Sequence, residues 1–237
     1  MIITRTTIGI KLKNMERILL NGLKALVTAG PTYERIDPVR FIGNFSTGKM
    51  GIELAYALYE LGCEVTLVLG PTHLNVDDHI YVIRVESAND MYVVCMDEFQ
   101  ESDIIVCSAA VADFRPANKA ENKIKKGKDE GMSIDLVRTV DILHEMGLSK
   151  NDKQVLVGFA LETQDALNYA RKKLEAKNAD MIVMNVPTKD TGFGTDTNKV
   201  SILCKGNENP INTELLSKKD IARVISNIIE EVYSSKN

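Results

Sequence analysis

The segment LKALVTAGP, residues 23–31, begins the pattern from which the fold is predicted. Its short apolar run ends in a glycine-proline pair, which is the pattern of a buried strand followed by a loop. Apolar residues at helical spacing follow over 48–61, with Gly62 as the stop signal. A second apolar run, residues 64–69, ends in another glycine-proline pair. Strand, helix and strand make a βαβ unit, which predicts parallel strands joined by a right-handed crossover.

The same alternation continues to the C-terminus. Further strands are expected at 81–85, 103–108, 155–159 and 181–184, and helices at 87–100 and 165–177. A capping-box pattern at 217–220 predicts the start of a final helix. Strands interleaved with helices predict an α/β fold with a doubly wound, mostly parallel, Rossmann-like sheet. Two excursions, 110–131 and 187–198, are long enough to predict functional loops or flexible insertions.

Length and composition set the class of protein. The chain has 237 residues, 44% of them hydrophobic and 26% charged, which is ordinary for a globular protein with one substantial core. We expect an N-terminal tail over residues 1–22 and a single domain over 23–237. The net charge of −4 gives no global reason to bind nucleic acid. No apolar run reaches the length of a membrane span, and the scattered cysteines favour a reducing, cytoplasmic location.

A first candidate site lies between residues 28 and 51. Gly48 and Gly51 open a helix, whose free N–H groups and dipole favour an anion. The segment 43–49 spells a P-loop, but Met50 stands where a Ser or Thr should bind magnesium. An insertion also separates this segment from the strand, and the Rossmann fingerprint G-x-G-x-x-G is incomplete. Glycines that serve only helix–sheet packing explain the pattern equally well.

Two further candidates contain small or basic residues. The segment SAAVADFRP, residues 108–116, leaves a buried strand, and its small side chains let a ring approach while Asp113 meets a hydroxyl or a cation. A packed strand followed by a turn is the alternative. The segment NKIKKGK, residues 122–128, is a basic loop that could close over a polyphosphate, although most such runs are solvated. Lys173 and Lys177 share one helix face, which solvent exposure alone also explains.

Taken together, several ordered segments carry a resemblance to one family. They are DPVR at 37–40, NFSTGKMG at 44–51, AAVADFRP at 109–116, KIKK at 123–126, VGFALET at 157–163 and GFGTDTNKV at 192–200. This series resembles phosphopantothenoylcysteine synthetase, the ligase half of the bifunctional bacterial coenzyme A biosynthesis proteins. The resemblance runs from about Leu23 to the final helix. It departs from the family pattern at 139–140, where Thr-Val replaces a common Asn-Pro.

The resemblance implies a reaction that forms a C–N bond and is unrelated to the ATP-grasp ligases. In it, 4′-phosphopantothenate and L-cysteine are joined through an acyl-cytidylate, with CTP consumed and CMP and pyrophosphate released. Mg²⁺ is required and no flavin takes part. Because two anions must meet, cationic groups have to offset the developing charge. The resemblance further implies a homodimer, and we expect a separate phosphopantothenoylcysteine decarboxylase because too few residues precede Leu23 to hold that half.

The family's functional residues carry over by position. Lys123 and Asn44 are expected to be catalytic: Lys123 meets the triphosphate, and Asn44 holds the substrate carboxylate with help from the backbone of Ala110. Asp113 is the candidate metal ligand, and the metal is expected to be held mainly by the nucleotide phosphates. The lysine-rich loop corresponds to a flexible basic strap. The expected nucleotide-binding residues are Cys107, Ser108, Ala109, Asp113, Lys123, Val140, Asp141, Ile142, Leu143, Phe159, Lys173 and Lys177.

Two other functions remain open at this point. A nicotinamide-dependent Rossmann oxidoreductase shares the fold, but it requires an acidic residue at the end of the second strand. Residues 69–71, Leu-Gly-Pro, offer none. A non-catalytic nucleotide-binding regulator would retain the pocket, and an inert Lys123→Ala substitution would favour it.

Overall fold

The central sheet has eight strands in the order β13-β12-β10-β9-β6-β1-β4-β5. The computed structural model describes residues 20–125, 131–161, 166–185 and 195–237. At one edge, β12 (Val200–Cys204) pairs antiparallel with β10 on one side and with β13 (Ile211–Asn212) on the other. The parallel strands are β1 (Lys24–Ala29), β4 (Glu64–Leu69), β5 (Tyr81–Arg84), β6 (Ile104–Cys107), β9 (Val155–Leu161) and β10 (Met181–Asn185).

Helices cover both faces of this sheet. One face is covered by α1 (Lys49–Glu60) and α5 (Lys218–Lys236). The other face is covered by α2 (Ala88–Phe99) and α3 (Ile142–Ser149). Helix α4 (Ala166–Ala176) packs beside β10. Successive residues of β1 point to opposite faces of the sheet: Val27 packs in the core beneath α1 and α5, whereas Leu26 packs in the core beneath α2 and α3. The doubly wound prediction is confirmed. Ser217 also caps α5 as expected, because its side chain accepts a hydrogen bond from the Asp220 N–H.

The order of the strands creates a crevice beside β1. Because β4 and β6 lie on opposite sides of β1, successive crossovers leave in opposite directions. Thr28 of β1 and Cys107 of β6 are paired at the carboxyl ends of these strands. In open α/β sheets a ligand binds at such a point.

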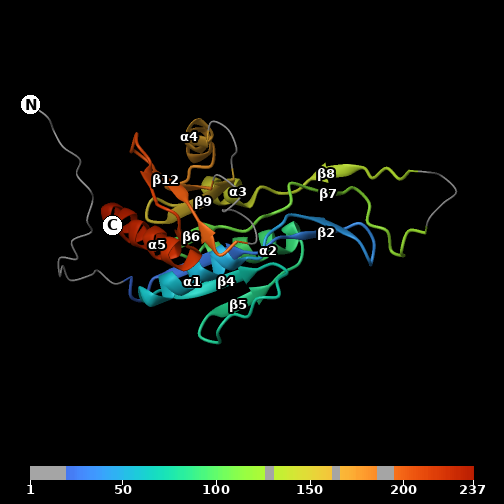
Figure 1. Ribbon diagram of the computed structural model, residues 1–237, viewed down its shortest axis with the longest axis horizontal. Coiled ribbons are helices and arrows are strands. Elements are labelled where there is room, and N and C mark those ends of the chain that lie inside the picture. Colours follow the sequence, from blue (N-terminus) through green and yellow to red (C-terminus); the bar gives the residue numbers. More distant parts are fainter. Residues whose placement is uncertain (1–19, 126–130, 162–165, 186–194) are drawn as a thin grey trace, which may run out of the picture.

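A long arm projects from the carboxyl edge of the sheet (Figure 1). It consists of the hairpin β2 (Tyr33–Arg35) and β3 (Phe41–Gly43), inserted between β1 and α1, and of the pair β7 (Phe114–Pro116) and β8 (Leu136–Arg138). The insertion was expected, but its strands were not, because three residues carry no readable periodicity.

A buried carboxylate ties the two halves of the arm together. Asp37 accepts from the Ile124 N–H at 3.1 Å and also pairs with Arg40, whose guanidinium donates to the Ile124 carbonyl at 3.0 Å. These contacts fix the start of the basic loop against the hairpin.

The N-terminal boundary differs from the expected one. Leu20 is buried in the α1–α5 core, so the folded part begins at least three residues before the expected boundary at Leu23. Residues 1–19 of the expected tail lie outside the described residues, as do 187–194 of the second excursion. The end of that excursion forms β11 (Thr197–Asn198), which pairs with β14 (Leu216–Ser217). Among the described helices, none combines the length and apolar composition needed to cross a bilayer.

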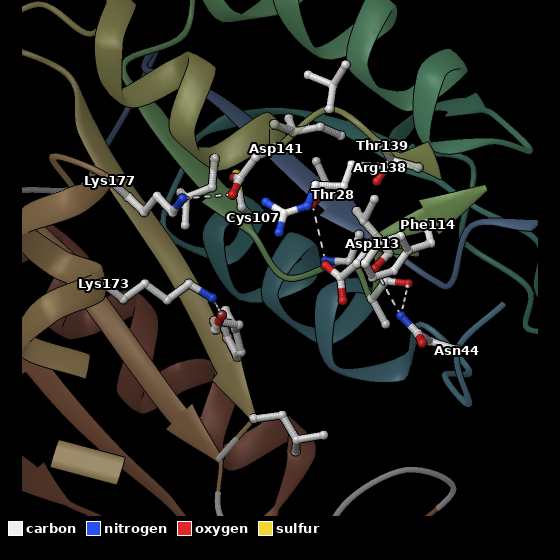
Figure 2. A pocket seen from close by; sticks show the side chains of 18 residues that line it. Thr28, Asn44, Cys107, Asp113, Phe114, Arg138, Thr139, Asp141, Lys173 and Lys177 are labelled. Carbon is white, nitrogen blue, oxygen red and sulfur yellow. Dashed lines mark hydrogen bonds and ion pairs between the residues drawn. The ribbon is translucent and has the colours of Figure 1, made fainter. Parts of the chain in front are cut away.

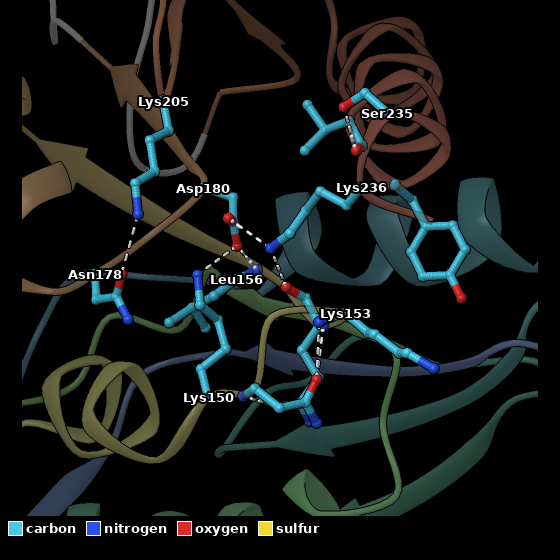
Figure 3. Close-up of polar contacts among 12 residues, drawn as sticks. Lys150, Lys153, Leu156, Asn178, Asp180, Lys205, Ser235 and Lys236 are labelled. Atoms are coloured by element: carbon cyan, nitrogen blue, oxygen red, sulfur yellow. Dashed lines mark hydrogen bonds and ion pairs between the residues drawn. The ribbon is translucent and has the colours of Figure 1, made fainter.

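Asp180 organises a polar cluster at the amino ends of the strands (Figure 3). Its carboxylate accepts from Lys150 Nζ at 2.7 Å, Lys236 Nζ at 2.8 Å and the Leu156 N–H at 2.8 Å. Burial opposes ionisation, but these donors lower the pKa of Asp180 below its ordinary value. The cluster therefore attaches the end of α5 to β9 and β10.

Candidate active site

A cavity of about 770 Å³ lies at the carboxyl ends of β1, β6 and β9 (Figure 2). We call it the Asp141 cavity. Its wall combines the end of β1, the turn after β6, the end of β8 with the start of α3, and one face of α4. The predicted residues in this wall are Asn44, Cys107, Ala109, Ala110, Asp113, Val140, Asp141, Ile142, Leu143, Phe159, Lys173 and Lys177.

Two predicted residues lie elsewhere. Ser108 lines a second, smaller cavity on the other side of the same turn, and its hydroxyl donates to the Thr28 carbonyl at 2.6 Å. Lys123 is exposed on the loop that follows β7 and is not part of the wall of the Asp141 cavity. Its contact with a triphosphate stays a prediction. Lys126, Gly127 and Lys128 of the expected strap lie outside the described residues.

Asn44 connects the hairpin to the turn after β6. Its Nδ2 donates to the carbonyls of Ala110 at 3.2 Å and Val111 at 2.9 Å. The side chain thus holds the Ala110 backbone at the rim of the cavity, which brings together the two residues expected to hold the substrate carboxylate. To bind that carboxylate, the amide has to exchange at least one of these carbonyls for the ligand.

The thiol of Cys107 forms an apolar part of the wall. Burial raises its pKa to about 12, so the group is neutral at physiological pH. Its Sγ lies 3.7 Å from the Met146 sulfur. A protonated thiol of this kind is a poor nucleophile, and the predicted role as a lining residue agrees with its environment.

Asp141 caps α3, a helix that the sequence analysis did not predict. The carboxylate accepts from the His144 N–H at 3.0 Å and from Lys177 Nζ at 2.8 Å. Burial opposes ionisation, but these donors lower the pKa of Asp141. The N–H groups of Ile142 and Leu143 precede the first intrahelical bond, from the Glu145 N–H to the Asp141 carbonyl. Such first-turn amides are available to a ligand in the cavity.

Cations line two sides of the Asp141 cavity. On α4, Lys173 Nζ donates to the Phe159 carbonyl at 2.7 Å, next to the Lys177–Asp141 pair. On the opposite side, the Arg138 guanidinium extends into the cavity (Figure 2). Arg138 was not predicted from the sequence, because its position depends on the pairing of β8 with β7, which sets it opposite Phe114. The other unforeseen wall residues are Thr28, Val111, Phe114, Thr139 and Leu161.

The carboxylates of the cavity set a limit on metal binding. Within the part of the chain that the structure describes, no three His, Cys, Asp or Glu side chains gather in a group that could hold a metal ion. Asp113 is exposed and lines the cavity, whereas Asp141 is paired with Lys177. One carboxylate suits Mg²⁺, which is commonly bound by one or two carboxylates together with substrate phosphates.

Curated relatives of this chain are mostly longer proteins. The coenzyme A biosynthesis bifunctional protein CoaBC of Bacillus subtilis is 48% identical over 206 residues, covering 86% of this chain and 50% of the relative. CoaBC of Vibrio cholerae is 41% identical over 215 residues, covering 90% and 53%. A protein from an unknown prokaryotic organism, named cysteine/cysteine sulfinic acid decarboxylase, is 47% identical over 217 residues, covering 91% and 59%. The chain thus spans about half the length of these relatives.

Solved structures share the fold. The crystal structure of the C-terminal domain of a CoaBC superposes with a TM-score of 0.78 at 44% identity, covering 92% of this chain and 98% of that one. A Cab2 mutant in complex with phosphopantothenate-cysteine gives a TM-score of 0.74 at 16% identity, covering 90% and 88%, a likeness of fold alone. Both structures confirm the prediction of a Rossmann-like fold. The CoaBC structure also confirms the predicted resemblance to the ligase half of the bifunctional proteins.

One family description matches almost the whole domain. It is the DNA/pantothenate metabolism flavoprotein C-terminal domain, matched over residues 20–233. The matched range begins at Leu20, the buried residue that precedes β1. This match and the CoaBC relatives show that the chain belongs to the family of the DNA/pantothenate metabolism flavoprotein C-terminal domain.

Proposed function

We propose that this chain is a phosphopantothenate–cysteine ligase of coenzyme A biosynthesis that uses CTP. One observation carries the proposal: a single cavity at the switch point of the sheet collects residues of the predicted nucleotide and carboxylate sites from five separate segments. The CoaBC relatives support the same assignment. The oxidoreductase alternative lacks support, because β4 ends at Leu69 and is followed by Gly70, where a ribose-binding acid is required.

In this proposal the nucleotide base lies against the start of α3. The N–H groups of Ile142 and Leu143 are suited to acceptor atoms of cytosine, and the neutral Cys107 thiol provides an apolar surface beside them. Backbone groups in a fixed helix turn can discriminate a base edge without a charged side chain. The departure from the family pattern at Thr139 and Val140 precedes α3, so it leaves these amides in place.

The first chemical step joins two anions. A carboxylate oxygen of 4′-phosphopantothenate attacks the α-phosphorus, the P–O bond to the leaving group breaks, and pyrophosphate departs. Lys173, Lys177 and Arg138 offset the developing negative charge, which is the kind of electrostatic stabilisation that contributes most in such sites. Asp113 would hold Mg²⁺ together with the phosphates, and the ion would supply further charge neutralisation. Lys123, which lies outside the wall of the cavity, is proposed to meet the triphosphate, as the resemblance implies.

The second step forms the amide. The cysteine amine attacks the acyl carbon of the acyl-cytidylate, CMP leaves, and the amine gives up a proton. Asn44 and the Ala110 backbone hold the acyl group at the rim of the cavity, where the hairpin meets the turn after β6. Because reaction requires this geometry in both steps, orientation supplies much of the rate enhancement. The product is then the substrate of phosphopantothenoylcysteine decarboxylase, whichever chain carries that activity.

We further infer that the ligase acts as a homodimer. The arm exposes several large apolar side chains, namely Val39, Phe41, Phe114, Leu136 and Val137. Apolar side chains exposed over one part of a molecule commonly mark a protein–protein interface. Sedimentation equilibrium of the chain and of a Phe41→Glu variant tests this inference: a monomeric chain contradicts it, and a dimer that dissociates on substitution supports it.

The decisive assay is pyrophosphate release from CTP. We expect release that requires both 4′-phosphopantothenate and L-cysteine, with 4′-phosphopantothenoylcysteine and CMP identified by mass spectrometry. Replacing CTP by ATP in parallel reactions measures nucleotide preference. Release that is independent of the acid, or the absence of any condensation product, contradicts the proposed function.

A further inference from the structure

Two chain segments of the Asp141 cavity are joined by one threonine. The first segment is the turn after β6, residues 109–113, and the second, residues 139–143, leads from β8 into α3; residues of both line the cavity (Figure 2). In the proposed function, the first segment carries Asp113 and the second carries the N–H groups that meet the base. The separation of the two segments therefore sets the space in which a base can lie.

Thr139 makes two hydrogen bonds to the turn after β6. Its N–H donates to the Asp113 carbonyl at 3.0 Å, which continues the β7–β8 ladder one step beyond the pairing of Phe114 with Arg138. Its Oγ1 donates to the Ala112 carbonyl at 2.6 Å. The backbone ladder thus reaches Asp113, and the hydroxyl extends the attachment one residue further into the turn.

Ala112 is held from both sides by threonine hydroxyls. Its N–H donates to the Oγ1 of Thr32, a buried residue that follows β1, at 2.9 Å. The Ala110 N–H also donates to the Gly30 carbonyl at 2.8 Å, so the turn is fixed relative to the end of β1. Through Thr139, the start of α3 is therefore attached to a turn whose position the central sheet determines.

The departure from the family pattern makes this attachment more important. A proline at position 140 would restrict the residue before it to extended backbone. Val140 imposes no such restriction, and its side chain is 38% exposed, so packing restrains it only weakly. The hydroxyl of Thr139 supplies a restraint at the point where the proline is missing.

The position of the α3 start affects the two kinds of base differently. Cytosine has a single six-membered ring, whereas adenine is a larger bicyclic purine that needs more space between the same two segments. If the α3 start moves away from the turn, the contacts of the Ile142 and Leu143 N–H groups with a pyrimidine lengthen. The same movement makes room for a purine, so both changes lower the preference for a pyrimidine nucleotide.

We propose that Thr139 is a positioning residue whose hydroxyl, through its hydrogen bond to Ala112, sets the preference of the nucleotide site for a pyrimidine base. It acts through the backbone of the two segments and does not contact the reacting atoms. The inference rests on the proposed function, because it takes the base to lie at the start of α3.

The test compares two substitutions that each remove a hydroxyl from a hydrogen bond to a backbone carbonyl. Thr139→Val keeps the shape of the side chain. Ser102→Ala is the matched control, because Ser102 precedes β6 at the amino ends of the strands and its Oγ donates to the Glu98 carbonyl at 2.9 Å. We measure kcat and KM for CTP and for ATP, with 4′-phosphopantothenate and L-cysteine saturating.

We expect Thr139→Val to raise KM for CTP about 3- to 10-fold, the range for one neutral hydrogen bond, and to leave kcat unchanged. The preference for CTP over ATP in kcat/KM should fall by at least the same factor. A merely structural role would weaken both nucleotides alike and would not move this ratio. Ser102→Ala should change neither KM nor the preference.

Further variants separate a lost contact from altered packing. Thr139→Ser retains the hydroxyl and lacks the methyl group, so it should restore most of the preference for CTP. Urea unfolding is measured for every variant. If Thr139→Val does not fold, Thr139→Ala takes its place, because it removes the hydroxyl without placing a methyl group against the Ala112 carbonyl.

The proposal is overturned by an equal loss for CTP and ATP in Thr139→Val, by a loss in Thr139→Ser as large as that in Thr139→Val, or by an equal effect of Ser102→Ala. An unmodified chain that condenses the two substrates without preferring CTP also overturns it, but leaves the ligase function standing. If the chain forms no condensation product, the proposed function fails. Calorimetric binding of CTP and ATP to the chain and to Thr139→Val then decides the role of Thr139, and binding of neither nucleotide overturns both proposals.

Discussion

Two lysine-rich regions lie at opposite ends of the same sheet, and their lysines are bound differently (Figures 2 and 3). At the amino ends, the side chain of Lys150 is 4% exposed and shares the carboxylate of Asp180, itself 7% exposed, with Lys236. At the carboxyl ends, Lys173 donates to a backbone carbonyl, and Lys177 pairs with Asp141, whose side chain is 53% exposed.

The difference separates a structural from a ligand-binding use of the same residue type. In the Asp180 cluster, both lysines donate to one buried carboxylate, which holds them inside the fold. In the Asp141 cavity, Lys177 pairs with a half-exposed carboxylate and Arg138 lines the wall, so cationic side chains lie where a ligand can contact them. Substitutions at the first region should therefore change folding stability, and those at the second should change binding.

The largest effect is expected for Asp180→Ala. Removing the carboxylate leaves Lys150 buried beside Lys236 without its counter-ion, which typically costs about 3–5 kcal/mol of unfolding free energy. Urea unfolding measures the change, and Asp152→Ala, at an exposed residue next to the cluster, is the control. A midpoint equal to that of the unmodified chain would show that the cluster does not stabilise the fold.

Lys123 differs from the lysines of both regions because it is exposed on the arm. We expect Lys123→Gln to lower kcat about 10²- to 10³-fold, as the loss of a donor to transition-state charge does elsewhere, with no change in urea unfolding. Lys119→Gln, at another exposed lysine of the same excursion, is the control. Pyrophosphate release at saturating substrates measures kcat, and a normal rate in Lys123→Gln would remove this residue from the mechanism.

Lys177→Gln sharpens the comparison from the binding side. Loss of one charge in the cavity should raise KM for CTP about tenfold, the effect of roughly 1.4 kcal/mol, and should change the unfolding free energy by less than about 1 kcal/mol because the ion pair is half-exposed. Lys172→Gln on the exposed side of α4 is the matched variant. The distinction between the two regions is wrong if Lys177→Gln destabilises the chain as much as Asp180→Ala.

The smallest effect is the pH dependence of the Asp180 cluster. Its pKa is lower in the folded than in the unfolded chain, where an aspartate titrates near 4, so the carboxylate stabilises the fold above about pH 4. This contribution is lost as pH falls through the lowered folded pKa, at about 1.4 kcal/mol per unit of difference between the two pKa values. The unfolding free energy of Asp180→Asn should show less acid dependence than that of the unmodified chain. Equal slopes between pH 5 and 2 in urea titrations would contradict this assignment.

Local patterns determined most of the secondary structure. The run 64–69 is β4 with the expected bounds, because a buried parallel strand needs only consecutive apolar residues between turn signals. The pattern at Ser217 and Asp220 correctly located the start of α5, since a cap is formed within four residues. The sequence also indicated Asn44, Asp113 and Asp141 through motifs that each occupy one short segment.

Only the tertiary structure decided which of these segments share a cavity. Arg138 enters the Asp141 cavity through a ladder of three residues, too short to read from periodicity, and Lys218 and Asn185 meet in one cavity although different elements supply them. Lys123 stands outside because Asp37 ties its loop to a hairpin 87 residues away in sequence from Ile124. A side chain's type follows from the sequence, but its partners depend on strand pairing and packing between distant residues, which no local pattern encodes.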